Sequence, residues 1–263
     1  MKKDKFTGLL TLDQLKSLKL SGLNETDRKS IFGQALDFYS EKVRVGKQTG
    51  ERDPFEAAGQ SLIHDFLPLH VPPVKYIGSG LARFAFAGED GHVCKFAVDS
   101  AGMRQNHDEI KTLRKYGGWP CFVKMYDFDA KNGFGLDVEA VAVIGEYTGT
   151  AKQMLYRLGA FGRDLDNMLY RIMTVCRRLS SYGFDVERVA RSFDSEQYDE
   201  MLELTNNIVQ AKTVQAKIFR KLAEYYKNEL SEHRTGFDDL HSGNVGYAYR
   251  DGELVLVILD VGS

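Results

Sequence analysis

A β-hairpin is predicted at the C-terminal end of the chain, and it limits the folds that the sequence can adopt. Two apolar runs, Val245–Tyr249 and Leu254–Leu259, flank the dipeptide Asp251-Gly252. This dipeptide favours the tight turn of a two-stranded hairpin because both of its residues tolerate a positive φ angle. A short antiparallel ribbon is therefore expected to pack on the segments that precede it.

Polar groups stand at both open ends of this hairpin. Asp239 and Asn244 lie five positions apart before the first strand, and Asp260 follows the second strand. The turn accounts for Asp251 but for neither Asp239 nor Asp260. Carboxylate and amide oxygens are ligands that Mg²⁺ prefers, and a carboxylate can also orient a hydroxyl group. We interpret these residues as part of a chemical site.

A lysine inside an apolar strand is the second feature of this site. Lys95 stands within Val93–Ala97, and Glu109 follows it in a predicted helix. A carboxylate there can pair with the ammonium group and direct it toward phosphate groups. One alternative is an edge-strand lysine whose ammonium group lies in water. Asp108 is the alternative acid, although Glu109 lies closer to the buried face that Ile110 defines.

A glycine pair separates the first two predicted strands. The residues are Gly78, Ser79 and Gly80. Glycines allow backbone amides to approach phosphate oxygens because no Cβ atom intervenes. Arg83 stands where the pattern G-x-G-x-x-G has its third glycine. Taken alone, a glycine pair of this kind is more typical of an ordinary turn.

The chain changes character at Pro72-Pro73, because proline ends helices. The residues before this point are predicted to be helical, with helices over Asp27–Val45 and Phe55–Phe66. After it, five β-rich runs and one helix at about 101–116 are expected to form a small sheet-based lobe. The five runs are Val74–Ile77, Arg83–Ala87, Val93–Val98, Phe122–Phe128 and Val138–Ile144.

The second half of the chain is predicted to be largely helical. An apolar stripe runs through 165–179, and a long helical region is expected over Ser195–Leu230. The expected fold class is α+β, with a small β-rich lobe, a largely helical lobe and the C-terminal hairpin. We predict an N-terminal helical segment that packs on a core of two lobes, and these three parts are residues 1–73, 74–147 and 148–263.

Charge and composition give no support to several classes of partner and of cysteine site. The 263-residue chain has a formal net charge of −2 and three widely spaced cysteines. The near-neutral charge favours neither nucleic acid nor an anionic membrane as a partner, and the cysteine spacing favours neither zinc nor disulfides. The sequence has no run of eighteen apolar residues, and its charged N-terminus does not resemble a signal peptide. We expect a cytoplasmic protein.

With these motifs in this order, the chain resembles the protein-kinase-like superfamily, and in particular the serine/threonine protein kinases encoded by tailed bacteriophages. The segment Asp239–Asn244 (DLHSGN) resembles their catalytic loop, and Asp260–Gly262 (DVG) stands where the magnesium motif would be. The resemblance covers residues 74–263. It implies a bilobal fold, ATP and Mg²⁺ as cofactors and host proteins as substrates, but no particular oligomeric state.

The resemblance also implies roles for single residues. Asp239 would orient the acceptor hydroxyl and accept its proton, and Lys95, held by Glu109, would bind phosphate groups of ATP. Asn244 and Asp260 would hold Mg²⁺. The other nucleotide contacts would come from the glycine loop and from the hinge between the lobes, namely from Gly78, Ser79, Gly80, Glu146 and Tyr147.

Departures from the family pattern leave two alternatives open. Phe237-Asp238 replaces the His-Arg pair of eukaryotic protein kinases, and three residues follow Asp260. The catalytic loop also resembles that of aminoglycoside and choline kinases, which usually carry a substantial helical segment after the magnesium aspartate. The expected function is a phage serine/threonine protein kinase. The alternatives are a small-molecule kinase of the aminoglycoside or choline type, and a pseudokinase that acts by binding a protein.

Overall fold

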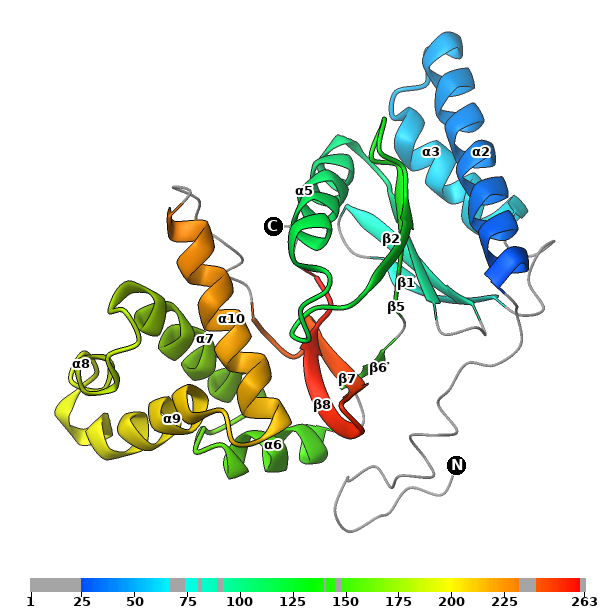
Figure 1. Cartoon of the computed structure of the whole chain (residues 1–263). Coiled ribbons are helices and arrows are strands. Elements are labelled where there is room, and N and C mark those ends of the chain that lie inside the picture. Colours follow the sequence, from blue (N-terminus) through cyan, green and yellow to red (C-terminus); the bar gives the residue numbers. More distant parts are fainter. Residues whose placement is uncertain are drawn as a thin grey trace.

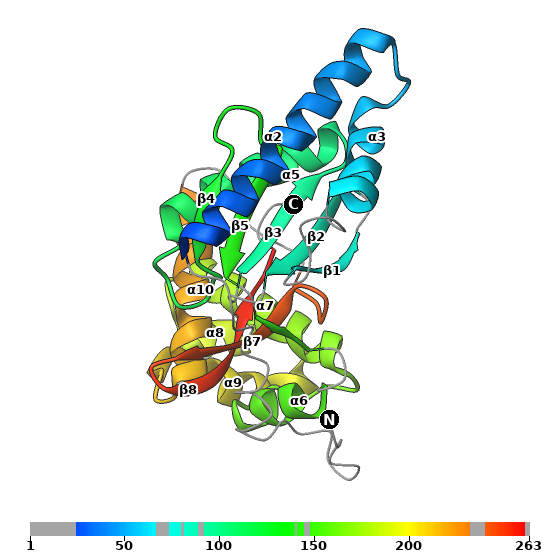
Figure 2. The same cartoon turned by 90° about the vertical axis from the view of Figure 1, so that its right-hand side faces the viewer.

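The computed structural model combines a five-stranded sheet, a largely helical part and a β-hairpin that lies between them (Figures 1 and 2). The expected α+β class with two lobes and a C-terminal hairpin is confirmed. The boundaries of the three predicted parts stay predictions. The residues that the structure describes are 25–66, 74–79, 82–88, 92–139, 141–144, 148–231 and 240–260.

The helical segment before Pro72-Pro73 is described from residue 25 onward. It consists of α2 (Glu25–Thr49), α3 (Pro54–Ser61) and a π-helical turn η1 (Leu62–Phe66). Asp53 begins α3, because its carboxylate accepts backbone hydrogen bonds from the first turn of that helix. The buried aromatic side chains of α2 lie against strand β3 (His92–Ala97) and the residues before strand β5 (Gly135–Glu139), so α2 and α3 cover one face of the sheet.

The sheet is antiparallel, with the strand order β1-β2-β3-β5-β4. Helix α5 (Ser100–Tyr116) follows β3 and packs against β3, β4 and β5. Figure 1 shows the sheet between α5 on one side and α2 and α3 on the other. The strands are β1 (Val74–Ser79), β2 (Arg83–Gly88), β3 (His92–Ala97), β4 (Met125–Phe128) and β5 (Gly135–Glu139).

Two predicted strands differ from the observed ones. The predicted strand Val138–Ile144 is wrong, because β5 ends at Glu139 in the large sheet and the next strand, β6 (Ala142–Val143), pairs with β7 in a second sheet. An apolar run does not reveal that its two halves pair with different strands. The strand predicted over Phe122–Phe128 is also longer than the observed strand β4, which begins at Met125. Phe122 forms an isolated bridge with the hairpin instead.

The helical part contains α6 (Thr148–Arg157), α7 (Leu165–Ser181), α8 (Val186–Ala190), the 3₁₀ turn η3 (Ser195–Gln197), α9 (Tyr198–Gln210) and α10 (Val214–Ser231). The apolar stripe of α7 is buried, as its spacing predicts.

The long helical region predicted over Ser195–Leu230 is confirmed as helical, but it is divided into η3, α9 and α10, because the chain reverses between α9 and α10. Ala211 adopts a left-handed conformation with φ of 49° and ends α9. Thr213 then accepts a hydrogen bond from the amide of Ala216 and starts α10. The helical spacing of the apolar residues persists through this break, so periodicity alone did not reveal it.

The hairpin forms as its turn dipeptide predicts. Strands β7 (Val245–Arg250) and β8 (Glu253–Ile258) pair in register, and Asp251 and Gly252 have φ angles of 51° and 79°. One hydrophobic cluster extends from α5 and β5 through this hairpin into α7, α9 and α10. No helix in the described part of the chain is long and apolar enough to cross a lipid bilayer.

Candidate active site

Lys95 and Glu109 form the centre of the candidate site. Lys95 Nζ on β3 lies 2.7 Å from Glu109 Oε1 on α5. Successive side chains of a strand point to opposite faces, and the neighbouring Phe96 contacts the ring of Phe32 on α2. Lys95 therefore points to the other face, where α5 lies. The Glu109 side chain is fully buried, whereas Asp108 is exposed.

Arg83 is a second cation at the same carboxylate, and it was not predicted as a site residue. Its Nη1 lies 2.5 Å from Glu109 Oε2, and its Nη2 donates to Asp260 Oδ2. Ala85 on β2 is opposite Lys95 on β3, so Arg83, two positions earlier, points to the same face. The sequence signal for this role is the arginine at the position of the third glycine.

The four charged groups balance one another. Burial opposes the charged form of Arg83, but the carboxylates of Glu109 and Asp260 outweigh burial and raise the pKa of its guanidinium. Arg83 therefore stays cationic. The group contains two cations and two carboxylates within direct contact, and its members are Lys95, Arg83, Glu109 and Asp260.

The segment after β8 brings Asp260 to the sheet. Lys95 Nζ donates a second hydrogen bond to the carbonyl of Leu259, at 2.9 Å. The backbone amide of Ile258 donates to the carbonyl of Cys121, also at 2.9 Å. These contacts hold the strand end against the sheet-based lobe. Asp260 consequently lies beside the Lys95–Glu109 pair although it is distant in the sequence.

The loop before β7 places Asn244 next to this strand end. The amide of Asn244 donates to the carbonyl of His241, and the amide of Gly243 donates to His241 Nδ1, both at 2.9 Å. The carbonyl of Asn244 accepts from the amide of Leu259 at 2.9 Å. Asn244 thus pairs with the residue that directly precedes Asp260, as a magnesium site built from both residues requires.

The donor groups fit Mg²⁺ that is shared with a nucleotide. Asn244 and Asp260 offer hard oxygen ligands, and the Asp260 side chain is 29% exposed. Mg²⁺ usually takes one or two protein ligands together with phosphate oxygens and water. Within the described residues, no group of three or more His, Cys, Asp or Glu side chains could hold a metal ion.

Asp166 positions the same loop from the helical part, and sequence reasoning missed it. It lies in the first turn of α7, and its Oδ1 accepts a hydrogen bond of 2.6 Å from the amide of Ser242. This backbone hydrogen bond, the Ser242 side chain and nearby His241 lower the pKa of the Asp166 carboxyl. An acidic residue in the first turn is a common helix feature, so no sequence pattern indicated a distant partner.

The remaining predicted site residues are partly described. Gly78 and Ser79 end β1 opposite Ala85 and Phe84, with a shift in register after Tyr76. Their contact with phosphate groups stays a prediction. Four predicted site residues lie outside the described part of the chain, and these are Gly80, Asp239, Glu146 and Tyr147.

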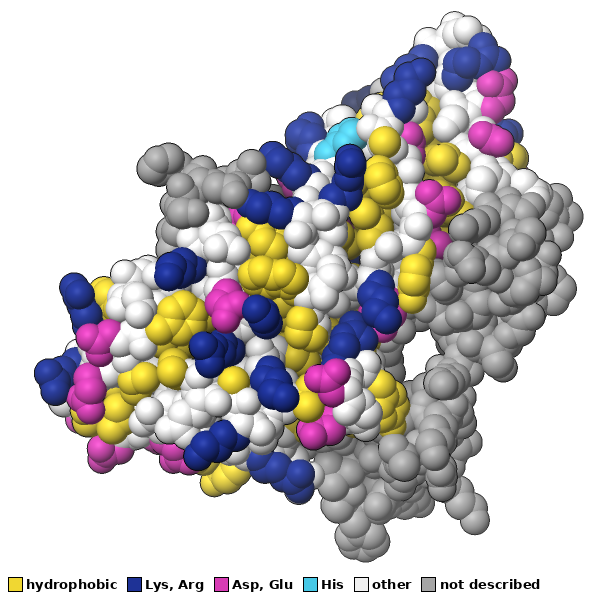
Figure 3. Space-filling view, in the orientation of Figure 1, with side chains coloured by type: hydrophobic (Ala, Val, Ile, Leu, Met, Phe, Trp, Pro, Cys, Tyr) yellow, Lys and Arg dark blue, Asp and Glu magenta, His cyan; other side chains and the backbone are white. Residues whose placement is uncertain are grey.

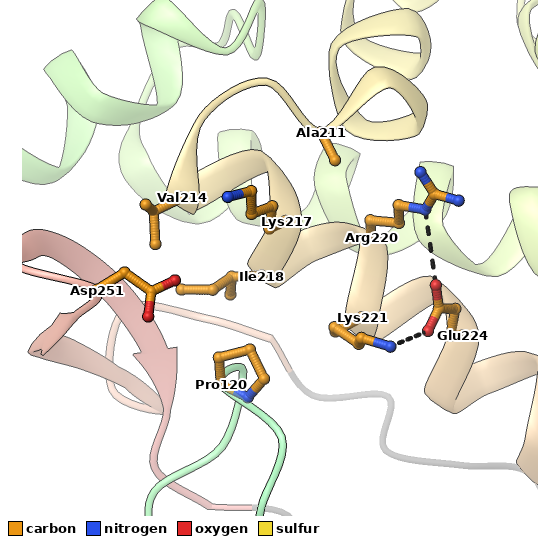
Figure 4. Close-up of a pocket in the computed structure, with 9 residues that line it drawn as sticks. All are labelled: Pro120, Ala211, Val214, Lys217, Ile218, Arg220, Lys221, Glu224 and Asp251. Atoms are coloured by element: carbon orange, nitrogen blue, oxygen red, sulfur yellow. Dashed lines mark hydrogen bonds and ion pairs between the residues drawn. The ribbon is translucent and has the colours of Figure 1, made fainter.

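A separate cavity of about 350 Å³ lies between α10 and the turn of the hairpin (Figure 4). Its lining includes Val214, Ile218 and lysine and arginine side chains of α10. Figure 3 shows several lysine or arginine side chains over the region of α10. Arg220 and Lys221 both pair with Glu224. None of the predicted site residues that the structure describes lines this cavity.

Comparisons with known proteins give a weak likeness in fold. No protein-family model matches the sequence, and no curated protein matches it. The GDP complex of a mutant aminoglycoside 2′-phosphotransferase-IIIa is 14% identical with a TM-score of 0.32, over 78% of this chain and 70% of that chain. The streptomycin–ATP–APH(2″)-IIa ternary complex is 11% identical with a TM-score of 0.32, over 76% and 69%. The functional assignment therefore depends on the contacts of the site itself.

Proposed function

We propose that this chain is an ATP- and Mg²⁺-dependent phosphotransferase of the protein-kinase-like type. The observation that carries the proposal is the ion pair between Lys95 on the third strand and Glu109 on the following helix, with Asp260 next to it. Protein kinases use a lysine on the third strand, a glutamate on the next helix and a magnesium-binding aspartate in the same arrangement.

Each group has a defined part in this reaction. Lys95 would bind phosphate oxygens of ATP, and Glu109 would keep its ammonium group in place. Asn244 and Asp260 would hold Mg²⁺, which offsets the negative charge of the phosphate groups when it is bound. Asp239 would orient the acceptor hydroxyl and accept its proton as the oxygen attacks the terminal phosphorus and ADP leaves. The hydrogen bond from Ser242 to Asp166 supports the loop that carries Asn244.

Two acceptor classes follow from different observations. The resemblance of the loop and magnesium motifs to phage kinases suggests a serine or threonine hydroxyl of a host protein. The form of the loop Asp239–Asn244 also resembles that of aminoglycoside kinases. A hydroxyl of a small molecule is therefore the second candidate acceptor.

The test is phosphate transfer from ATP that is labelled on its terminal phosphate. Purified protein with Mg²⁺ receives bacterial lysate, an aminoglycoside or choline in separate reactions. The inactive variants are Asp260→Asn and Asp239→Ala, and the matched control is Asp251→Asn in the exposed hairpin turn.

Labelled proteins with the parent and the control, but not with the inactive variants, would support a protein kinase. A labelled small molecule would support the second acceptor class. ATP binding without any transfer would contradict the proposal and favour a pseudokinase.

A further inference from the structure

Arg83 makes more contacts within the site than the proposed roles require. Its side chain is 10% exposed, and it contacts Glu109, Asp260 and Asn106, the last with Nη1 to Oδ1 at 3.3 Å. Glu109 thus has Lys95 on one carboxylate oxygen and Arg83 on the other. One buried guanidinium joins the helix of the sheet-based lobe to the strand end that carries Asp260.

The chemistry of arginine suits this position. The guanidinium is a planar fork with several donors, so it can bind two carboxylates at once, whereas a lysine ammonium is a single point of charge. A glycine at position 83 would provide no such contact. The register of β2 against β3 fixes the direction of the side chain toward the face where Lys95 and Glu109 meet.

The charge of Arg83 changes what the site can bind. Without Arg83, the group of Lys95, Glu109 and Asp260 would carry a net negative charge and would attract a free divalent cation. With Arg83 the group is neutral, and Asp260 Oδ2 already accepts a hydrogen bond from the guanidinium. A free metal ion therefore gains little binding free energy at Asp260. A metal ion bound to nucleotide, in contrast, brings its own phosphate ligands and negative charge.

We infer that Arg83 is a positioning residue that holds Glu109 and Asp260 in the nucleotide-free protein and makes metal binding depend on nucleotide. This inference rests on the proposed function, because it assigns Asp260 to magnesium. In the free protein, the guanidinium supplies the positive charge next to Asp260. With nucleotide and metal bound, Asp260 would hold Mg²⁺ and Arg83 would keep its contact with the second oxygen of Glu109.

The experiment titrates nucleotide-free protein with Mg²⁺ or Mn²⁺ and follows binding by calorimetry and by thermal unfolding. The variants are Arg83→Gln, which removes the charge, and Arg83→Lys, which keeps the charge but cannot bridge both carboxylates. Arg104→Gln removes an exposed arginine of α5 and serves as the matched control. The double variant Arg83→Gln/Asp260→Asn tests whether any gained metal binds at Asp260.

For Arg83→Gln we expect free metal to bind at least ~10-fold more tightly than to the wild type, because a nearby cation is removed. Wild type, Arg83→Lys and Arg104→Gln should bind free metal weakly and should gain stability from metal when a nonhydrolysable ATP analogue is present. The double variant should lose the gained site. Unchanged metal affinity in a folded Arg83→Gln variant would overturn the inference, as would equally tight metal binding to the wild type without nucleotide.

These readouts are independent of phosphate transfer. If the wild type transfers phosphate but Arg83→Gln gains no metal affinity, the inference on Arg83 is wrong and the proposed function stands. If Arg83→Gln gains a metal site at Asp260 but the wild type transfers no phosphate to any acceptor, the charge compensation by Arg83 holds and the proposed function fails.

Discussion

Glu109 on α5 accepts hydrogen bonds from two cations, one on each carboxylate oxygen. Lys95 Nζ lies 2.7 Å from Oε1, and Arg83 Nη1 lies 2.5 Å from Oε2. The carboxylate is completely buried, so its charge is balanced by these two neighbours and not by water. Buried charges are tolerated in proteins when they are paired and hydrogen-bonded. Glu109 is therefore the group on which the positions of both cations depend.

The variant Glu109→Gln should destabilise the protein by about 3 kcal/mol, because it leaves two buried cations without their shared partner. It should also lower kcat/KM for ATP on the order of 100-fold, since Lys95 loses its orientation. Chemical denaturation and steady-state kinetics measure the two effects. The control Asp108→Asn changes the exposed neighbour and should stay within about 0.5 kcal/mol of the parent. Equal effects of the two variants would contradict this role of Glu109.

The variant Asp166→Asn should weaken the loop that precedes β7, because a neutral amide oxygen accepts the hydrogen bond from the amide of Ser242 less strongly than the carboxylate does. We expect a loss of about 0.5 kcal/mol, since the group is exposed and solvent screens the interaction, together with a lower kcat. Asp194→Asn is a suitable control, because Asp194 precedes η3 without a side-chain cap hydrogen bond. A variant with full kcat would argue against a positioning role for Asp166.

The same contact predicts a dependence on pH. Hydrogen bonds from Ser242 lower the pKa of Asp166 below its ordinary value of 3.8 in the folded protein. The ionised form is therefore favoured by folding, so its contribution is present above pH 3.8 and is lost as the pH falls through the lowered pKa. The difference in free energy of unfolding between wild type and Asp166→Asn should be constant near neutral pH and should shrink in acid. A difference that grows in acid would contradict this sign.

The variant Tyr39→Phe tests the packing of α2 on the sheet. The buried Tyr39 hydroxyl donates to the carbonyl of Ala97 at the end of β3, and burial raises the pKa of this phenol, which keeps it a donor. Losing the hydrogen bond should cost about 1–2 kcal/mol of unfolding free energy, because the carbonyl stays buried. Tyr170→Phe, at a side chain that is 60% exposed, should have almost no effect.

The variant Ala211→Gly should stabilise the protein by about 0.5–1 kcal/mol, because glycine adopts the left-handed conformation between α9 and α10 without strain. The variant Ala57→Gly in the regular helix α3 should instead lower the free energy of unfolding by about 1 kcal/mol. Thermal unfolding of both variants is the measurement. Destabilisation by Ala211→Gly would show that the chain does not reverse at this residue.

Local chemistry made part of this structure predictable. Asp251-Gly252 specifies a tight turn through its φ angles, and the 3.6-residue period of α7 specifies a buried face. Lys95 in an apolar strand was recognisable because burying an ammonium group requires a partner. In each of these cases the deciding property belongs to residues that are close together in the sequence.

The rest depends on contacts between distant segments. The run Val138–Ile144 reads as one strand, yet its two halves pair with different sheets. Arg83 reads as a departure from a glycine pattern, and its contact with Asp260 becomes evident once β2 and the end of β8 lie side by side. Asp166 reads as an ordinary residue of a first helical turn, although it supports the loop before β7. Periodicity and motif spacing do not report such pairings.

The most direct test of the central claim is the rate of phosphate transfer from labelled ATP by wild type, Lys95→Met and Lys124→Met. Lys124 is an exposed lysine outside the site, so its variant controls for the loss of a lysine. We expect transfer by the wild type and by Lys124→Met, and a rate at least ~100-fold lower for folded Lys95→Met. Equal rates for all three proteins, or transfer by none of them, would contradict a phosphotransfer site built on Lys95.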